Sequence, residues 1–526
     1  MKNNIHSTKS TILQWNNIKL PLFFESILAG LFSGGIVVLY RYLLSQAEII
    51  REIVYTRAKD GNVAAIALGF LFLLAAGFVV AFIIKKVPMV KGSGIPQVKG
   101  VLLRQFNMEW GKELAAKFIG GVLALGAGLS LGREGPSIQL GAHAGMGIGK
   151  LFKRPSVEQK YLITCGASAG LAAAFNAPLA GVMFSLEEMH KNFSPVILTS
   201  AMLSSLAADF VSRKFFGQQP VFNFTDVKAL PLTYYIHLIL LGVILGLFGV
   251  LFNKFLTLSQ DLYEKLKFIK AQYRVFIPIL TAGVLGFVLP EVLGGGHELI
   301  MTVGRENPGM LVLLILIIAK FLFTMMSYGS GAPGGIFLPL LVIGALTGKL
   351  YAIAGISFMG VDPQYSLNFV ILAMAAYFTA IVKAPITGSI LITEMTGSFS
   401  HLPGLMAISM TAYFTAELLK SKPVYDILLG RLLKSKGGSE FVGEEIKRVL
   451  LEAAVSINSE AEHRKVSELA WPQQCLLVSI KRGENEIIPN GDTVLYSGDF
   501  ITMLTSEAGA AKAKRKLQKI CMEKAR

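Results

Sequence analysis

Three glycine-rich segments of this chain have the composition of anion-binding turns. They are GSGIP at 92–96, GREGP at 132–136 and GSGAPGGIF at 329–337, and apolar sequence surrounds each of them. A glycine-rich turn that leads into a helix exposes backbone N–H groups at the positive end of the helix dipole, where an anion is stabilised. Such glycines can instead serve close packing between membrane helices. Because three segments share the pattern, we expect an anion-binding site.

Two hydroxyl side chains could add donors to this site. Ser93 lies within GSGIP, and Tyr425 lies in SKPVYDILLGRLL, just before the last short helix expected in the apolar region. A hydroxyl group can bind an anion without a full charge, which allows both binding and release. Ser93 could instead cap a helix, and Tyr425 could instead anchor the chain at a membrane surface.

Glu134, within GREGP, is a carboxylate at a helix start that should attract anions. While ionised, it can occupy the anion site as a tethered competitor. Protonation removes its charge and therefore its reason to stay. Burial opposes the charged form and N–H donors support it, so that this balance predicts a proton-sensitive gate. A structural ion pair with Arg133 is the alternative.

Other ionisable residues in apolar sequence are functional candidates by default. Glu187 and Glu188 end the segment GVMFSLEEM, and one of them could relay protons from the cytoplasm, unless both are solvated at a helix end. Glu394 could be a buried hydrogen-bonding acid. Three lysines could raise the local potential for anions or extend to the membrane surface: Lys117, Lys320 and Lys383.

The composition places these residues in a membrane. Of 526 residues, 53% are hydrophobic and only 16% are charged, whereas soluble domains carry about 25% charged residues. Residues 63–84 form an uncharged apolar run, long enough for a helix of about 20 residues to cross the hydrocarbon core. Many of roughly sixteen apolar segments are short or interrupted by Gly and Pro, which is typical of re-entrant helices. We predict an all-α polytopic membrane protein.

The net charge of +16 is explained by membrane topology rather than by nucleic-acid binding, because Lys and Arg line cytoplasmic loops. The polar segment 1–20 lacks the apolar h-region of a cleaved signal. Both termini, which are rich in lysine, are therefore expected in the cytoplasm. The chain shows no metal cluster, nucleotide loop or nucleophile constellation, so that we predict neither a cofactor nor an enzymatic activity.

The membrane part, expected at 21–435, contains an internal repeat. NAPLAGVMFSLEEM (176–189) resembles KAPITGSILITEM (383–395), with a one-residue slip that pairs Glu188 with Glu394. A second match aligns Gly132, Gly135 and Gly145 with Gly331, Gly334 and Gly344. Paired broken segments predict an inverted-repeat transporter with its site at the membrane midplane. We place the two repeats at about 21–215 and 232–435.

A small α/β domain is expected at 440–526, where the long apolar runs stop. CLLVSIKR and DTVLYSGDFITMLT alternate apolar and polar residues as half-buried strands do. PNGD at 489–492 marks a turn between them, and a basic helix should follow from about Ser506.

The order and spacing of the three glycine motifs and of SKPVY resemble the signature segments of the CLC family of chloride channels and transporters, over about 20–435. The resemblance implies an inverted repeat of about eighteen helices, many of them broken or re-entrant. It also implies a homodimer with a separate pore in each subunit. The segment NGDTVLYSGDFITML is similar to the TrkA-C type of regulatory domain, which implies a cytoplasmic module that binds an unknown small ligand or supports dimerisation.

Site residues follow from the resemblance by motif position. It implies that Glu134 is the external gating glutamate and that Glu188 is the internal proton-transfer glutamate. It further implies that chloride is bound by two hydroxyl groups and two backbone amides, those of Ser93, Tyr425, Ile336 and Phe337.

The acid at position 188 favours a Cl⁻/H⁺ antiporter of the plasma membrane, because channel members of the family usually lack an acid there. An uncoupled, voltage-gated-type chloride channel is the alternative. A fluoride/H⁺ antiporter is disfavoured, because the fluoride-exporting branch departs from the serine at position 93. The expected partners are chloride, protons, membrane lipid and a second copy of the chain. A membrane enzyme or receptor would require a catalytic cluster, and none is evident.

Overall fold

The computed structural model describes residues 2–59, 63–191, 194–224, 227–435, 448–483 and 485–522. The chain divides into two compact units, Met1–Leu432 and Leu433–Arg526.

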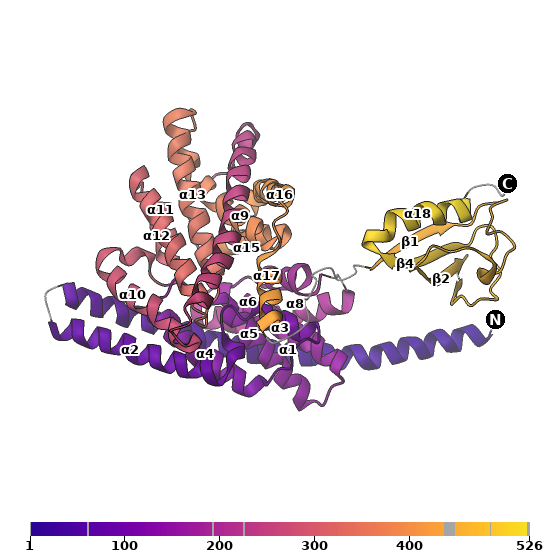
Figure 1. Ribbon diagram of the computed structural model, residues 1–526, viewed down its shortest axis with the longest axis horizontal. Coiled ribbons are helices and arrows are strands. Elements are labelled where there is room, and N and C mark those ends of the chain that lie inside the picture. Colours follow the sequence, from indigo (N-terminus) through magenta and orange to yellow (C-terminus); the bar gives the residue numbers. More distant parts are fainter. Residues whose placement is uncertain are drawn as a thin grey trace. The chain divides into compact units, whose positions relative to one another are not determined.

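The first unit is built from α-helices joined by turns and short 3₁₀ segments (Figure 1). Its described residues contain α1 (Lys2–Lys59), α2 (Val63–Lys86), α3 (Ile95–Leu102), α4 (Trp110–Gly126), α5 (Glu134–Leu151), α6 (Ser156–Phe175), α7 (Pro178–Phe184), α8 (Pro195–Phe216), α9 (Tyr235–Lys265), α10 (Phe276–Val288), α11 (His297–Arg305), α12 (Met310–Gly329), α13 (Phe337–Phe358), α14 (Ser366–Val382), α15 (Pro385–Thr396), α16 (Leu402–Leu418) and α17 (Val424–Ser435).

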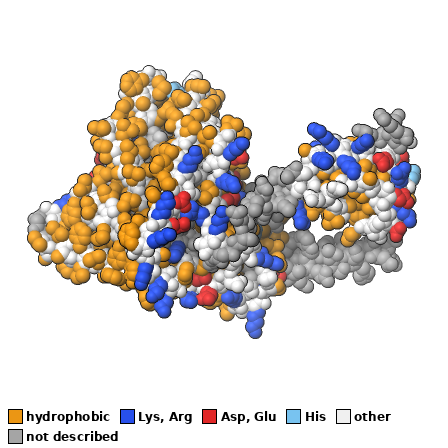
Figure 2. Space-filling view, in the orientation of Figure 1, with side chains coloured by type: hydrophobic (Ala, Val, Ile, Leu, Met, Phe, Trp, Pro, Cys, Tyr) orange, Lys and Arg blue, Asp and Glu red, His pale blue; other side chains and the backbone are white. Residues whose placement is uncertain are grey.

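Helix length and surface confirm the expected all-α membrane fold. Within the described residues, eight helices are long and apolar enough to cross a membrane, while α3 and α7 have only 8 and 7 residues. Hydrophobic side chains cover a broad face of this unit (Figure 2). Among its exposed apolar residues are Leu68, Phe78 and Phe82 of α2. An apolar surface of this extent is suited to lipid rather than to water.

The N-terminal boundary that we expected near residue 20 falls within α1. This helix runs from Lys2 to Lys59 and contains Pro21. Secondary structure therefore does not mark the end of an N-terminal segment.

The two halves of the first unit are related by an inverted repeat. Gly132 and Gly335 exchange backbone hydrogen bonds of 2.7 and 2.8 Å in an antiparallel bridge. Each of these glycines stands two residues before a helix, α5 in one half and α13 in the other. Because an exchanged antiparallel pair has local two-fold symmetry, the equivalent segments run in opposite directions.

The glycine register predicted from the sequence is wrong by about one helical turn. An added Cβ on Gly145 would lie 2.0 Å from the backbone oxygen of Leu162, and one on Gly348 would lie 2.3 Å from that of Phe369. Gly145 therefore corresponds to Gly348 and not to Gly344. In both α5 and α13, glycines recur at intervals of about one helical turn. An alignment shifted by one turn therefore still paired glycine with glycine.

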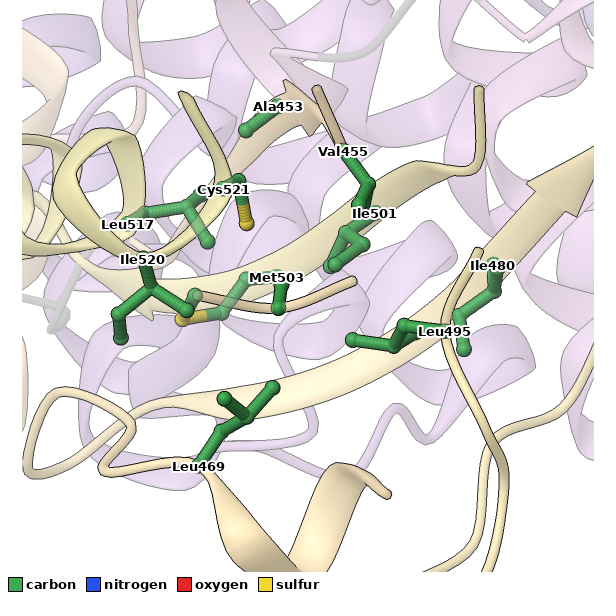
Figure 3. Packing of buried hydrophobic residues seen from close by; sticks show 11 residues of the cluster. Ala453, Val455, Leu469, Ile480, Leu495, Ile501, Met503, Leu517, Ile520 and Cys521 are labelled. Atoms are coloured by element: carbon green, nitrogen blue, oxygen red, sulfur yellow. The ribbon is translucent and has the colours of Figure 1, made fainter. Parts of the chain in front are cut away.

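The second unit is a four-stranded antiparallel sheet with a helix packed against it. The strand order is β1-β4-β2-β3. The elements are β1 (Arg448–Ala454), β2 (Leu476–Arg482), β3 (Asn485–Ile487), β4 (Phe500–Ser506) and α18 (Glu507–Met522). Apolar side chains of the sheet and of α18 meet in one core (Figure 3), among them Ile480, Ile501, Leu517 and Ile520.

The strand predictions for this unit hold in part. CLLVSIKR coincides with β2, and the helix expected from about Ser506 is α18. DTVLYSGDFITMLT was too long a strand, because only its end forms β4. Before β4, the carboxylate of Asp499 accepts a hydrogen bond of 2.9 Å from the N–H of Tyr496, and Gly498 has a φ of +89°, which closes a turn. The sequence analysis also missed β1 and β3.

Asp499 makes a buried ion pair with Arg482 in this unit. The guanidinium donates two hydrogen bonds, of 2.8 and 2.7 Å, to the carboxylate, whose side chain is only 1% exposed. Burial alone would raise the pKa of Asp499, but these donors and the N–H of Tyr496 hold it below its ordinary value. The stabilisation is therefore present above the unfolded pKa of about 3.9 and is lost as the pH falls through the lower folded pKa.

We expect Asp499→Asn to lower the free energy of unfolding of the second unit by about 1–3 kcal/mol at neutral pH, because a buried charge-assisted bond is lost. Amide hydrogen exchange in the full-length protein measures this as faster exchange in β4 and at Val455, whose N–H donates to the backbone oxygen of Asp499 at 2.8 Å. Asp492→Asn, at an exposed ion pair with Lys465, should leave exchange unchanged. Equal exchange rates in all three proteins would contradict the assignment.

Candidate ion-binding site

The three glycine-rich segments meet within the first unit. The N–H of Gly334 donates to the oxygen of Gly92 at 3.0 Å, and the bridge between Gly132 and Gly335 joins the other two segments. An added Cβ on Gly135 would lie 2.5 Å from Ser93 Oγ and 3.2 Å from the Cα of Gly335. The first turns of α3, α5 and α13 therefore lie side by side.

Ser93 is buried beside this junction with its hydroxyl group unpaired. Its side chain is 1% exposed, and its Oγ has no hydrogen-bond partner among the described residues. Gly94, with a φ of +93°, is the N-cap of α3, and no side chain in the described ranges caps this helix. Ser93 is therefore not a helix cap.

Tyr425 lies in the first turn of α17 and is also fully buried. Its hydroxyl group has no partner within the described part of the chain. Its ring meets the ring of Phe184 edge to face, with 6.3 Å between the centroids. A residue in these surroundings is not a surface anchor, and its free hydroxyl group can serve as a donor.

Ile336 and Phe337 form the start of α13 and are both 0% exposed. The first N–H groups of a helix have no partner within the helix. The ring of Phe337 packs between those of Phe175 and Phe378, at 5.3 and 4.5 Å between centroids. This packing holds the start of α13, and with it the backbone N–H groups of its first turn, in a fixed position.

Glu134 is the first residue of α5, and its side chain is 0% exposed. The backbone N–H groups of Glu134 itself and of Leu338 interact with its carboxylate, and no ion pair with Arg133 is present among the residues described. An added Cβ on Gly132 would lie 2.2 Å from Oε2 of Glu134 and 3.0 Å from the nitrogen of Leu338. The carboxylate thus lies against the first turn of α13, where two helix starts favour negative charge.

A cavity of about 770 Å³ reaches the residues on either side of this carboxylate. Its lining includes Arg133 and Leu338, together with Arg41 and His297. Acidic residues, Glu298 among them, line the same cavity. Glu134 itself does not line it, so that the buried carboxylate lies behind its wall.

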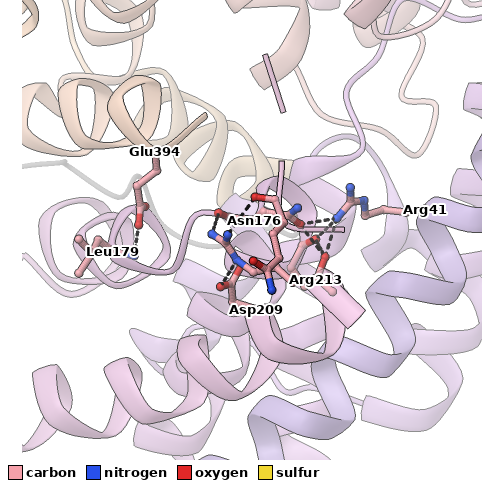
Figure 4. Close-up of polar contacts among 9 residues, drawn as sticks. Arg41, Asn176, Leu179, Asp209, Arg213 and Glu394 are labelled. Atoms are coloured by element: carbon pink, nitrogen blue, oxygen red, sulfur yellow. Dashed lines mark hydrogen bonds and ion pairs between the residues drawn. The ribbon is translucent and has the colours of Figure 1, made fainter. Parts of the chain in front are cut away.

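Arg41 is held at this cavity by a polar network (Figure 4). Its Nη1 donates to Asn176 Oδ1 at 3.0 Å and to Ser212 Oγ at 2.7 Å. Arg213 donates to the backbone oxygen of Asn176 at 3.0 Å and pairs with Asp209 at 2.6 Å. The network fixes the junction between α6 and α7, where Asn176 has a φ of +53°.

Glu187 and Glu394 cap helices of the opposite repeat. Glu394 accepts hydrogen bonds from the N–H groups of Leu179 (Figure 4) and Ala180 at the start of α7, at 3.1 and 2.8 Å. Glu187 accepts equivalent bonds at the start of α15, including one of 2.7 Å from the N–H of Thr387. Glu187 and Glu394 therefore occupy equivalent positions in the two repeats, and each accepts hydrogen bonds from backbone N–H groups at a helix start of the other repeat.

Glu188 has no counterpart in the second repeat. Ser185–His190 forms a π-helical turn, which inserts one extra residue into a helix, whereas α15 is a continuous α-helix up to Thr396. The predicted pairing of Glu188 with Glu394 is therefore wrong. The extra residue follows Glu187, so that Glu187 keeps the capping position and Glu188 is the addition.

Glu188 is buried in a chain of ion pairs. Its carboxylate accepts a hydrogen bond of 2.8 Å from Lys99 Nζ, and the two side chains are 2% and 5% exposed. Lys99 also pairs with Asp426, which pairs in turn with Lys191 at 2.7 Å. Glu188 is therefore not solvated at a helix end, which excludes that alternative.

Two of the three lysines support glycine turns. Lys117 Nζ donates to the oxygen of Gly92 at 2.6 Å, and Lys320 Nζ donates to that of Gly294 at 2.8 Å. Both lysines are 0% exposed and do not extend to a membrane surface. Lys383 instead pairs with Glu417 at 2.7 Å. The GSGIP turn thus has its repeat counterpart at Gly294, which the sequence comparison missed.

The sequence analysis missed Lys99 and Asp426, which belong to the chain of ion pairs around Glu188. Lys99 lies on α3, which begins just after Ser93, and Asp426 directly follows Tyr425. An ionisable residue in a membrane segment is itself a signal, so that both could have been selected.

The fold and these buried acids define a membrane protein built for ion transport. The chain matches the family described as voltage gated chloride channel over residues 76–417, and the TrkA-C domain over residues 450–518. It belongs to the voltage gated chloride channel family, and its second unit is a TrkA-C domain.

Relatives and solved structures agree with this assignment. The chain is 35% identical over 424 residues to the H(+)/Cl(-) exchange transporter ClcA of Vibrio cholerae, covering 79% of this chain and 90% of the relative. It is 33% identical over 446 residues to the protein of the same name from Citrobacter koseri, covering 82% and 92%. The structure of a slow cyanobacterial Cl⁻/H⁺ antiporter matches with a TM-score of 0.74 and 30% identity, covering 79% of this chain and 99% of that one.

A CLC-type fluoride/proton antiporter also shares the fold, with a TM-score of 0.65 and 23% identity over 76% of this chain and 95% of that one.

Proposed function

We propose that this protein exchanges chloride for protons across the plasma membrane. The observation that carries the proposal is the placement of two buried acids, Glu134 at the junction of three helix starts and Glu188 on the π-helical turn. An anion path needs neither acid for charge selection, whereas a proton path requires titratable groups. Relatives named H(+)/Cl(-) exchange transporters support this function.

Chloride would be bound by neutral donors at this junction. We assign the hydroxyl groups of Ser93 and Tyr425 and the backbone amides of Ile336 and Phe337 as its ligands. The two hydroxyl groups are buried and free to donate, and a buried unpaired donor is unfavourable by about 1–3 kcal/mol. Neutral donors stabilise the anion and still allow it to leave.

Glu134 would be the gate between chloride and protons. As a carboxylate it occupies the helix starts and excludes chloride. When it accepts a proton it loses its attraction to the N–H donors, and chloride takes its place. Proton release then restores the closed state, so that the two ions exchange places.

Glu188 would deliver and accept the proton on the cytoplasmic side. No metal or organic cofactor takes part in this scheme, because chloride and protons are themselves the transported species. We further propose a homodimer with a pathway in each subunit, cytoplasmic termini, and a small ligand or dimer contact at the TrkA-C domain.

An uncoupled chloride channel is the second candidate, because the same anion site would serve it. The burial of Glu188 favours the exchanger, since a buried acid in a membrane protein is retained only at a cost. Proton flux is therefore the property that separates the two functions.

Purified protein in liposomes tests the proposal. With a chloride gradient as the only driving force, chloride efflux should drive protons inward against their gradient, as read by a pH electrode. Chloride flux without proton movement would establish a channel instead. Proton uptake driven by a fluoride gradient but not by a chloride gradient would establish a fluoride exporter.

A further inference from the structure

We propose that Lys99 is a positioning residue for proton transfer at Glu188, and that it links the charge of Glu188 to α3, which follows Ser93, and to α17, which carries Tyr425. The inference rests on the proposed role of Glu188 as the internal proton-transfer acid.

Lys99 is shared between two carboxylates that lie far apart in the sequence. It contacts Glu188 at 2.8 Å and also pairs with Asp426. Lys99 and Glu188 are almost fully buried, whereas Asp426 is 33% exposed and is also held by Lys191. The four charges sum to zero, so that protonation of Glu188 leaves a net positive cluster.

The second repeat builds the same frame without this ion pair. Gly94 and Gly296 are equivalent N-caps of α3 and α11, with φ of +93° and +88°. The residue of α11 that corresponds to Lys99 is then the apolar Met301. Glu188 likewise belongs to the π-helical turn that α15 lacks in its described course. The fold therefore does not require the pair, which favours a functional reason for it.

The ion pair with Lys99 links the charge of Glu188 electrostatically to the helices beside the anion site. When Glu188 is ionised, Lys99 is attracted to both carboxylates. When Glu188 binds a proton from the cytoplasm, its bond to Lys99 weakens, and Lys99, which stays protonated, is held by Asp426 alone. Lys99 lies on α3, which begins two residues after Ser93, and Asp426 lies on α17 next to Tyr425. This change therefore acts between these two helices.

Other charged groups near Glu188 are already engaged. His190, at the end of the π-helical turn, bonds to Thr164 at 2.5 Å, and Lys160 of α6 donates to the Leu102 oxygen at 2.6 Å. Lys191 contacts Asp426. Within the described ranges, Lys99 is the cation that contacts the Glu188 carboxylate.

Two substitutions should move the pH profile of chloride-driven proton flux in opposite directions. Lys99→Met removes the cation that favours the carboxylate, so that the profile shifts to higher pH by about one unit or more. Asp426→Asn removes a competing anion, so that the profile shifts to lower pH. Lys99→Arg keeps the charge and should keep the pH profile close to that of the unmodified protein. Lys112→Met, at an exposed site on α4, should leave the profile unchanged.

Infrared difference spectroscopy reads the protonation of Glu188 without any transport. At neutral pH, Lys99→Met should show a protonated carboxyl band that is absent from the unmodified protein. The double variant Lys99→Met/Glu188→Gln should lose this band, and because it removes both charges it also controls for folding.

The outcomes separate the two proposals. Proton-coupled flux in the unmodified protein, with neither a shifted profile nor a new carboxyl band in Lys99→Met, would overturn the role of Lys99. A new band in a protein that moves no protons would support the charge effect of Lys99 on Glu188 while refuting the exchanger.

Discussion

Replacing Glu188 by glutamine should reduce chloride-driven proton movement by on the order of 100-fold, the contribution typical of a positioned acid–base group, while chloride flux continues. The amide has the size of the carboxylic acid and cannot carry a proton. In the described residues, Glu188 is hydrogen-bonded to Lys99 and not to the three glycine segments. Parallel recordings of chloride and pH in liposomes measure both fluxes in the same preparation.

The neighbouring acid provides the matched control. Glu187 caps α15 through backbone N–H groups, so that Glu187→Gln should keep proton coupling and lower stability by about 1 kcal/mol. Loss of coupling in Glu187→Gln together with full coupling in Glu188→Gln would reverse the two assignments. A chloride flux that disappears in Glu188→Gln would show that this acid shapes the anion path itself.

The sequence could predict the helix starts at the site because each depends on local chemistry. A glycine that adopts a positive φ, as Gly94 does, and a proline in the first turn of the helix mark the start of α3. Glycine and proline residues also located the starts of α5 and α13, although their N-caps, Arg133 and Ile336, have right-handed φ and ψ. Glu134 was then placed correctly, since its position within the motif fixes it at the first turn of α5.

Partners that lie far apart in the chain could not be predicted in this way. Lys99, Glu188 and Asp426 come from three elements, and nothing in the local pattern of one indicates the other two. The repeat register failed for a related reason. Glycines recur once per turn along α5 and α13, and only the contacts with α6 and α14 determine which glycines are equivalent.

Once the repeat register is known, comparing the two repeats separates shared residues from residues found in one repeat, as the two capping acids show. Glu187 and Glu394 bind equivalent N–H groups in opposite repeats. Glu188 and Lys99, by contrast, have no equivalent acid or lysine in the described part of the second repeat. Asymmetry within a symmetric frame thus marks Glu188 and Lys99 as residues that the shared frame does not require.

Replacing Glu134 by glutamine should abolish proton coupling and remove the pH dependence of chloride flux. The glutamine side chain is neutral at every pH, so that it cannot compete with chloride for the helix starts and cannot carry a proton. Chloride flux should therefore persist and become equal at acidic and neutral pH. Flux recordings across that pH range, in the same liposomes as the unmodified protein, provide the measurement.

A second variant separates the position of this carboxylate from its charge. In Gly132→Ala the added methyl group would lie 2.2 Å from Oε2 of Glu134, so that the carboxylate must move while its charge and the start of α5 are retained. We expect chloride flux that is faster and coupling that is weaker than in the unmodified protein, with pH dependence retained. If Glu134→Gln continued to pump protons, the gate would have to be another group, and the displacement in Gly132→Ala would then leave coupling unchanged.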